Sequence, residues 1–429
     1  MQIHVVESGD SLNSIANTYS ISPNQIASAN QVSETDPLVI GQSLVIPIQG
    51  SYYWVQSGDS MSSIAQKFGM NQNTLAQTNE WPIERELPVG FRLYIPQKPK
   101  SMGVFNAYIE PSGDAFSEVL QNAARESAPY LTYLAPFSYH ANRDGSLTPP
   151  QLDDLASIAA EDGATLMMVI SNLEEGQFSA ELGEIILNNE DVQDNLLNNI
   201  ISVAKEQNFK DIHFDFEFLR PEDREAYNQF LRKAADRIHQ EGFLISTALA
   251  PKTSAEQTGA WYTAHDYKAH GEIVDFVVIM SYEWGYSGGP PMPVSPITEV
   301  RKVLEYAISE IPSNKILMGQ NLYGYDWTLP FEPGGDYAKA LSPQAAISLA
   351  RERNVPIQYD YTEQAPFIDY KDDEGQDHKV WFEDARSIQA KFNLLKELQL
   401  RGMSYWKLGL AFPQNWLLID DNFNVIKMT

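Results

Sequence analysis

The stretch "DIHFDFEFL", residues 211–219, alternates polar and apolar side chains from its first residue almost to its last. Successive side chains of a β-strand point to opposite faces. One face of this strand would therefore carry Asp211, His213, Asp215 and Glu217, and the other face isoleucine and phenylalanine. The polar face must meet either bulk water or an enclosed site that uses carboxylates.

Seven further β-rich runs accompany this strand, and helical stretches separate them. In chain order, with the quoted stretch as the fourth, they are residues 103–110, 131–138, 165–171, 211–217, 243–250, 274–282, 315–323 and 402–408. Eight strands that alternate with helices predict an α/β fold of the (β/α)8 TIM barrel type. A doubly wound open sheet is the competing fold, but it usually has fewer strands and often a Gly-rich phosphate loop, which this sequence lacks.

A barrel answers the question that the strand raises. Its outer strand face packs on helices, and its inner face leads to an active site at the carboxyl ends of the strands. We expect Glu217 to be the last residue of its strand, with Asp215 one layer below and His213 below that. Burying such groups without partners costs roughly several kcal/mol each, so this column indicates a functional site.

Composition limits the class of protein. The chain has 429 residues, of which 43% are apolar, and a net charge of −27. This charge argues against nucleic acid and against general adhesion to anionic membranes. The absence of cysteine excludes disulfides, zinc–thiolate sites and thiol nucleophiles. We expect a monomer without cofactor or metal. We expect no membrane insertion, because no apolar run is long enough to span a membrane. The start "MQIHVVESGD" lacks the features of a secretion signal.

Two repeats precede the barrel. "HVVESGDSLNSIANTYSISPNQIASANQV" returns as "YWVQSGDSMSSIAQKFGMNQNTLAQTNEW", 49 residues later. Each repeat reads strand, helix, helix, strand, because a β-rich pair precedes the "SGDS" turn and a helical apolar stripe follows it. We predict domains at 1–49, 50–97 and 98–429, with a possible small insertion within 326–384.

The repeats resemble LysM modules over their full length, with the "GDS(L/M)xxIA", "N" and "(L/Y)xIP" landmarks in order. The resemblance implies a shallow groove that binds glycans containing N-acetylglucosamine. The residues implied are Gly9, Asp10, Ser11 and Ile40 in the first module and Gly58, Asp59, Ser60 and Val89 in the second. The alternative is that the glycine and aspartate of the turn serve only the fold.

The spacing of Asp215 and Glu217 indicates a type of acid catalysis. Two residues along a strand span about 6.6 Å, so the carboxyls can approach, and repulsion would keep one of them protonated. That proton suits a poor leaving group such as a glycosidic oxygen. Adjacent carboxylates fit neither the conventional retaining nor the inverting arrangement. They do fit substrate-assisted cleavage, in which the 2-acetamido oxygen of the sugar attacks.

The strand "KDIHFDFE" resembles the D-G-x-D-x-D-x-E motif of glycoside hydrolase family 18. The resemblance implies that Glu217 protonates the leaving oxygen and that Asp215 orients the acetamide. Lys210, Asp211 and His213 depart from the motif. A histidine at the position of the deep aspartate is expected to hydrogen-bond while neutral and to change the pH dependence of the reaction.

Other strand ends agree with this family. "IMSYEWGY" resembles its M-x-Y-D motif, which implies that the Tyr282 hydroxyl donates to the acetamide oxygen and that Glu283 reaches the sugar hydroxyls. "SYWKLG" matches the tryptophan of the eighth strand, which implies that Trp406 is the floor under the −1 sugar. Further candidates for the cleft lining, with a core position as the alternative, are Tyr108, Phe137, Asn321 and His213.

The whole chain is similar to the spore-germination peptidoglycan hydrolases, including "VWFED" at 380–384 and "YWKLGLAFPQNW" at 405–416. This resemblance implies an N-acetylglucosaminidase of cortex peptidoglycan at the spore coat or the coat–cortex boundary. One alternative is a chitinase, which shares fold and mechanism. A glycan-binding lectin with an inactive barrel is less favoured, because Glu217 is present.

Overall fold

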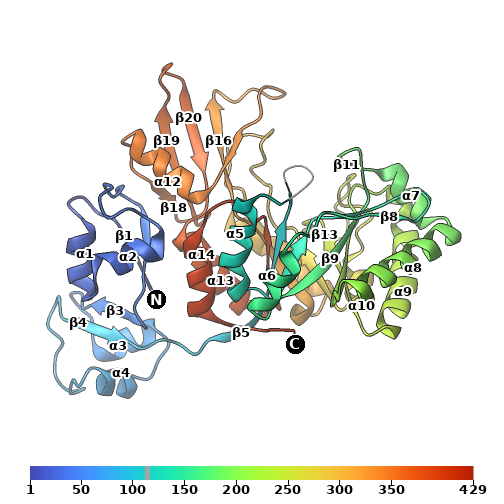
Figure 1. Ribbon diagram of the computed structural model, residues 1–429. Coiled ribbons are helices and arrows are strands. Elements are labelled where there is room, and N and C mark those ends of the chain that lie inside the picture. Colours follow the sequence, from blue (N-terminus) through green and yellow to red (C-terminus); the bar gives the residue numbers. More distant parts are fainter. Residues whose placement is uncertain (112–115, 429) are drawn as a thin grey trace.

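The computed structural model describes residues 1–111 and 116–428 (Figure 1). Eight parallel strands pair in chain order, and the last pairs with the first, which confirms the predicted barrel. The strands are β5 (Ser101–Ile109), β6 (Tyr133–Pro136), β9 (Thr165–Ser171), β12 (Asp211–Asp215), β13 (Leu244–Leu249), β14 (Phe276–Ile279), β15 (Ile316–Asn321) and β21 (Gly402–Trp406).

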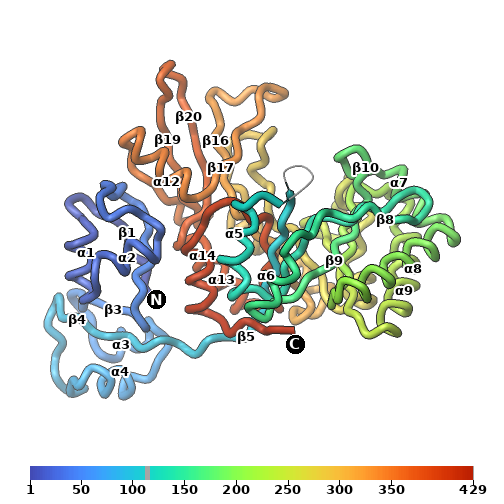
Figure 2. The backbone as a smooth tube through the Cα atoms, in the orientation of Figure 1, coloured from blue at the N-terminus to red at the C-terminus, as the bar shows by residue number. Residues whose placement is uncertain are grey.

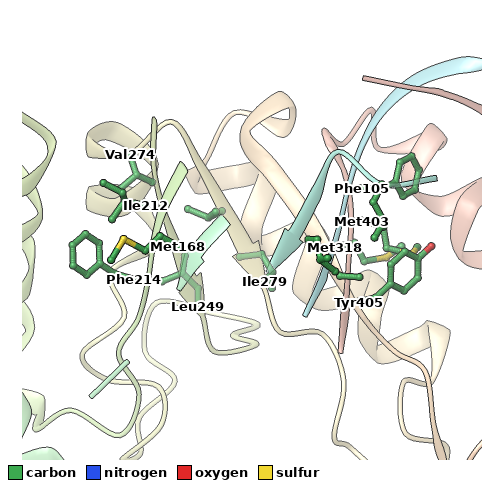
Figure 3. Packing of buried hydrophobic residues seen from close by; sticks show 14 of the residues in the cluster. Phe105, Met168, Ile212, Phe214, Leu249, Val274, Ile279, Met318, Met403 and Tyr405 are labelled. Carbon is green, nitrogen blue, oxygen red and sulfur yellow. The ribbon is translucent and has the colours of Figure 1, made fainter. Parts of the chain in front are cut away.

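Helices surround the barrel and cover the apolar outer faces of its strands. They are α5 (Glu118–Ser127), α6 (Leu155–Glu161), α7 (Ala180–Leu187), α8 (Glu190–Glu206), α9 (Arg224–Gln240), α10 (Tyr267–Ile273), α11 (Ile297–Glu310), α13 (Ala385–Glu397) and α14 (Pro413–Asn422). Ile212 and Phe214 lie in this layer beside Met168 and Leu249 (Figure 3). Their burial is the main favourable term that holds helices to sheet.

Short elements complete the barrel. They are β7 (Tyr139–Ala141), β8 (Leu147–Thr148), β10 (Leu173–Glu174), β11 (Gln177–Phe178), β22 (Phe423–Val425) and the 3₁₀ turns η1 (Ala128–Tyr130), η2 (Pro221–Asp223) and η3 (Ser313–Lys315). Strand β22 pairs with the start of β5, so the end of the described chain lies beside the point where the chain enters its first barrel strand (Figure 1).

Strand β12 is shorter than predicted. It ends at Asp215, so Glu217 lies two residues beyond the strand and not at its last position. Phe218 has φ +53° and is 43% exposed, whereas Phe214 and Phe216 are fully buried. The polar–apolar alternation therefore stops at Glu217, because the chain leaves the strand conformation there.

A second sheet lies between β15 and α13, and its residues overlap the stretch 326–384 in which a small insertion is predicted. Its strands are antiparallel in the order β17-β16-β20-β19-β18, and one helix, α12, packs on it (Figure 1). The elements are β16 (Gly324–Leu329), β17 (Lys339–Leu341), α12 (Pro343–Glu352), β18 (Gln358–Asp360), β19 (Ala365–Lys371) and β20 (Asp377–Trp381). We call residues 324–381 the insertion.

The two repeats form the predicted strand–helix–helix–strand units, with both strands of each unit antiparallel. Module 1 contains β1 (Gln2–Val5), α1 (Leu12–Tyr19), α2 (Pro23–Asn30) and β2 (Ser43–Ile46). Module 2 contains β3 (Ser51–Trp54), α3 (Met61–Lys67), α4 (Gln72–Thr78) and β4 (Arg92–Ile95). Capping boxes begin α1 and α3. The hydroxyls of Ser11 and Ser60 accept from the backbone N–H three residues on, and their own backbone N–H groups donate to the hydroxyl oxygens of Ser14 and Ser63.

Module 1 is packed against the rest of the molecule (Figure 2). The Gln414 amide on α14 donates to Asn30 Oδ1 and to the Ser43 carbonyl, both at 2.9 Å. Val45 belongs to the barrel core, and Val39 belongs to the apolar core of the insertion. Module 2 is held on module 1, for example by Gln2, whose amide exchanges hydrogen bonds with the Tyr52 backbone.

Within the described parts of the chain, no helix combines the length and the apolar character needed to cross a membrane.

Candidate active site

A cleft of about 740 Å³ opens at the carboxyl ends of the barrel strands. Side chains from β5, β12, β14 and β21 and from the loops after them line it, together with β16 of the insertion. Nine residues of the barrel were singled out from the sequence for this cleft, and seven of them line it: Asp215, Glu217, Tyr282, Glu283, Tyr108, Phe137 and Trp406.

Asp215 and Glu217 are almost fully buried at the floor of the cleft, with exposed fractions of 5% and 8%. Burial raises the pKa of Asp215 to about 7. Burial, and then the nearby Asp215 carboxyl, raise the pKa of Glu217 well above its ordinary value. Asp215 Oδ1 has no hydrogen-bond partner among the described residues although it is buried. The pair thus offers a protonated acid beside an acceptor that is free to bind a ligand N–H.

The backbone of Glu217 is held by an asparagine from the neighbouring strand end. Asn172 Oδ1 accepts from the Glu217 N–H, and Asn172 Nδ2 donates to the Glu217 carbonyl, each at 3.0 Å. These two hydrogen bonds fix the backbone of Glu217, which lies beyond the end of β12 and so has no strand pairing to hold it. The side chain of Glu217 accepts from the indole Nε1–H of Trp261.

Three aromatic side chains line the cleft together with the two carboxyls. Trp406 lies at the end of β21 with its ring centroid 5.5 Å from that of Tyr108 and 4.9 Å from that of Phe137, both nearly edge to face. Trp406 remains partly exposed to the cleft. An exposed indole face backed by two fixed rings is suited to stacking on a sugar ring.

Tyr282 and Glu283 follow β14. Burial raises the pKa of the Tyr282 hydroxyl well above its ordinary value, so the group remains a donor at neutral pH. Glu283 has φ +69° and accepts from the hydroxyls of Tyr323 and Tyr325. Burial raises the pKa of the Glu283 carboxyl, and the two tyrosines partly offset this increase. Glu283 therefore lines the cleft as an oriented acceptor.

His213 is fully buried and does not line the cleft, so its prediction as a substrate-binding residue is wrong. Its ring bonds to the hydroxyls of Tyr108 and Ser246, each at 2.8 Å. Ser246 Oγ in turn donates to Asp211 Oδ2 at 2.6 Å. Burial lowers the pKa of His213 to about 3, so the ring is neutral. Its partners are Tyr108 and Ser246, and no bond joins it to Asp215.

Asn321 also lies away from the cleft, contrary to the prediction. It is fully buried at the end of β15, where its oxygen accepts from the Ser295 hydroxyl at 2.7 Å and its amide donates to the Tyr323 carbonyl at 2.7 Å. The same serine bonds to Glu383, which forms a buried ion pair with Lys391 at 2.9 Å. Asn321 therefore serves a buried network that joins β15 to the loop after β14 and to α13.

In the modules, part of the predicted groove is occupied by contacts within the fold. Asp10 accepts from the Glu7 N–H and from His4, and Asp59 accepts from the Gln56 N–H and the Tyr53 hydroxyl. Ser11 and Ser60 are the helix caps described above. The side chains of Ile40 and Val89 are 51% and 70% exposed, and any side chain at Gly9 or Gly58 would point into open space.

Several residues of the cleft carry no signal in the sequence. Trp261 lies in the loop after β13, where no periodicity marks it, Tyr323 follows β15, and Tyr325 lies on β16 of the insertion. Lys407, which pairs with Glu110, lies within the quoted "SYWKLG", in which only the tryptophan has a predicted role. Among the described residues, no cluster of three or more histidine, aspartate or glutamate side chains is arranged to hold a metal ion.

Comparison with known proteins agrees with this geometry. The sequence matches Glycosyl hydrolases family 18 over residues 117–411 and the LysM domain over residues 4–47 and 53–96. The chain is 65% identical over 429 residues to the cortical fragment-lytic enzyme of Bacillus subtilis (strain 168), and the match covers 100% of both proteins.

Solved structures give the same relationship. The structure resembles the crystal structure of the spore cortex-lytic enzyme SleL of Bacillus megaterium with a TM-score of 0.92 and 56% identity, covering 100% of this chain and 99% of that one. A chitinase from Chromobacterium violaceum shares the fold, with a TM-score of 0.68 at 24% identity over 75% of this chain and 98% of that one. The chain is thus a glycosidase that belongs to glycosyl hydrolase family 18 and carries two LysM domains ahead of its barrel.

Proposed function

We propose that this protein hydrolyses the glycan of spore cortex peptidoglycan at N-acetylglucosamine during germination. The full-length similarity to a cortical fragment-lytic enzyme and to a spore cortex-lytic enzyme supports this substrate. The observation that carries the mechanism is the buried Asp215 oxygen without a partner beside the raised pKa of Glu217. We infer that the protein acts as a monomer at the spore coat or the coat–cortex boundary.

In the first step the acetamido oxygen of the −1 sugar attacks its own anomeric carbon. Glu217 donates its proton to the glycosidic oxygen, the bond to the leaving glycan breaks, and a cyclic oxazolinium ion forms. Asp215 accepts the acetamide N–H and stabilises the positive charge, and the Tyr282 hydroxyl donates to the acetamide oxygen. Trp406 supports the sugar ring from below. The enzyme needs no second carboxylate across the sugar for this step.

In the second step water adds to the anomeric carbon from the side that the leaving glycan vacated. Glu217, now a carboxylate, takes a proton from this water, and the bond between the anomeric carbon and the acetamide oxygen breaks. Glu217 is protonated again, and the product has retained stereochemistry. Glu217 thus acts first as the acid and then as the base. Because it must carry a proton at the start of each cycle, its pKa needs to lie near or above the working pH.

Mass spectrometry of the products tests the substrate. Purified cortex fragments and chitin oligomers are digested in parallel, and the reducing ends are identified. We expect N-acetylglucosamine at the new reducing end of cortex fragments, with chitin oligomers cut more slowly at equal concentration. Faster cleavage of chitin oligomers would make the protein a chitinase, which is the alternative that shares this fold and mechanism.

A second test addresses the nucleophile. Fragments whose −1 sugar is de-N-acetylated still fit the cleft but lack the attacking oxygen, so we expect their cleavage to fall by at least about 10³-fold. A thiazoline analogue of the cyclic ion is expected to inhibit. Ready cleavage of the deacetylated fragment, or an inverted anomer as the first product by proton NMR, would contradict the mechanism.

A further inference from the structure

Trp261 is the one side chain among the described residues that donates a hydrogen bond to the Glu217 carboxyl. Its indole stacks on Phe218, with centroids 6.2 Å apart and planes at 10°. Phe218 is the residue after Glu217 and adopts the positive φ that turns its ring out of the barrel. The acid is therefore held through its own side chain and through the ring next to it, by the same indole.

The loop that carries Trp261 is fixed at both ends. The Ala250 N–H donates to His265 Nδ1 at 2.9 Å, so the ring proton of this neutral histidine is on Nε2, which donates to the Phe216 carbonyl at 2.9 Å. Burial lowers the pKa of His265 to about 4, which agrees with a neutral ring. The loop thus binds the chain at two points: His265 donates to the carbonyl of Phe216, between the two catalytic residues, and Trp261 donates to the carboxyl of Glu217.

Trp261 also forms a wall between two cavities. It lines the main cleft and a neighbouring cavity of about 460 Å³, which Tyr282 and Glu283 line as well. The other titratable groups that face Glu217 are Asp215 on β12, Tyr108 on β5 and Tyr282 after β14. None of these forms a hydrogen bond to the Glu217 carboxyl in the described structure, so the indole alone sets its rotation.

We propose that Trp261 is a positioning residue that fixes Glu217 Oε2 and thereby directs Oε1, with the acid proton, toward the glycosidic oxygen. An N–H donor prefers the oxygen that carries no proton, so the bond to Oε2 assigns the proton to Oε1. The same bond favours the carboxylate that exists after proton transfer, because hydrogen bonding to a charged form stabilises it. The role rests on the proposed function of Glu217 as the acid.

Trp261→Phe keeps an aromatic ring over Phe218 and removes only the donor. We expect kcat on soluble fragments to fall roughly tenfold with KM nearly unchanged, because the acid loses its fixed rotation. The alkaline limb of the pH profile should move up by about one unit, because the carboxylate loses a stabilising donor. Trp81→Phe is the matched control, since the Trp81 indole in module 2 donates to a backbone carbonyl, that of Arg85, at 3.1 Å.

A measurement on the otherwise unchanged protein covers the case in which Trp261→Phe does not fold. With ¹⁵N-labelled tryptophan, the indole N–H signal of Trp261 should shift with pH at the midpoint of the alkaline limb, and Glu217→Gln should remove this titration. A flat indole signal, or a pH profile of Trp261→Phe that superimposes on that of the unchanged enzyme, would overturn the proposal. Full activity of Glu217→Gln with a titrating indole would instead disprove Glu217 as the acid.

Discussion

At the scale of single residues, the site depends on a chain of hydrogen bonds whose direction is determined. Ser246 donates its one proton to Asp211, so the Nδ1–H of neutral His213 must donate to Ser246, and the Tyr108 hydroxyl must donate to Nε2. The Tyr108 hydroxyl is therefore directed below the cleft. We infer that Tyr108 meets the sugar with its ring, while Asp215 Oδ1, which has no partner among the described residues, is left to bind the acetamide.

The first prediction concerns the acid. Glu217→Gln keeps the shape and the acceptor for the Trp261 indole but has no proton to give, so we expect turnover to fall by roughly 10³-fold or more with the fold retained. Steady-state kinetics on soluble cortex fragments, with circular dichroism as the check on folding, measure this. Turnover within tenfold of the unchanged enzyme would remove Glu217 from the mechanism.

The second prediction concerns stability and pH. Burial raises the pKa of Asp215 from 3.8 to about 7, so between these values the folded state binds more protons than the unfolded state. The free energy of unfolding therefore falls as pH rises through this window. Asp215→Asn cannot ionise, and at pH 8 we expect it to be more stable than the unchanged protein by roughly 1–3 kcal/mol, with little activity.

Denaturant unfolding at pH 4 and pH 8 measures this difference. At pH 4 the two proteins should be similar, because Asp215 is then protonated in the folded state. Asp236→Asn, at an exposed position on α9, is the control and should leave the free energy of unfolding unchanged at both pH values. An equal loss of stability from pH 4 to pH 8 in Asp215→Asn and in the unchanged protein would show that folding does not raise the pKa of Asp215.

Part of this site could be predicted from the sequence, and the rest required the fold. Asp215 and Trp406 end their strands, and Glu217 and Tyr282 lie two and three residues beyond theirs, so the strand pattern could place all four at one edge of a barrel. Trp261 could not, because its position depends on a loop held by His265. His213 and Asn321 have the same pattern as ligands, but partners from other strands satisfy His213 and partners from loops satisfy Asn321.

At the scale of elements, the two LysM modules have equivalent loops in different surroundings. The loop before β2 is bound by both the insertion and α13. The Ile40 carbonyl accepts from the Ile357 N–H of the insertion at 2.9 Å, and the Gly41 carbonyl accepts from Arg386 of α13 at 3.0 Å. The equivalent loop before β4 ends at Gly90, where an added Cβ would have no atom within 4 Å. Module 1 is therefore part of the catalytic unit, whereas the loop of module 2 is open.

The third prediction uses these glycines as a matched pair. Gly41 and Gly90 have φ +82° and +81°, so alanine costs similar backbone strain at both. At Gly41 the added Cβ would lie 1.8 Å from the Ile357 carbonyl oxygen, so module 1 must also shift. We expect Gly41→Ala to lower Tm several degrees more than Gly90→Ala, and hydrogen exchange at the Ile357 N–H to speed up only in Gly41→Ala. Equal Tm losses would show that module 1 is not clamped by the insertion.

The repeat pattern predicted both modules correctly but could not reveal this difference. Val39 and Pro88 occupy the same position of the repeat, yet Val39 is buried in the core of the insertion and Pro88 is exposed. A repeat specifies the fold of each unit. Which unit docks depends on a partner surface, here α12 and β18–β20, that lies some 300 residues further along the chain.

At the scale of the whole molecule, contacts run from module 1 through the insertion to the catalytic cleft. Val39 packs in the insertion, whose strand β16 places Tyr325 in the cleft beside Glu283. In the view of Figure 1 module 2 lies below module 1, and the chain runs from it directly to β5 of the barrel. A cut after residue 97 would remove Val39 and Val45 from two cores, so an isolated barrel is expected to be less stable than the intact chain.

The last prediction therefore tests glycan retention by a surface change and leaves both cores intact. Val89 of module 2 is 70% exposed in the open loop, and Val89→Asp places a charge there without disturbing a packed contact. If module 2 anchors the enzyme on a polymer, the variant should lose roughly tenfold or more in retention on insoluble cortex glycan, because linked weak sites gain avidity only on a polymer. Its kcat/KM on short soluble fragments should be unchanged, as the cleft is untouched. Val119→Asp on α5, at a position 69% exposed and outside both modules, is the control for added surface charge. Equal retention of the two variants in a pull-down on insoluble glycan would mean that module 2 does not bind it through this loop.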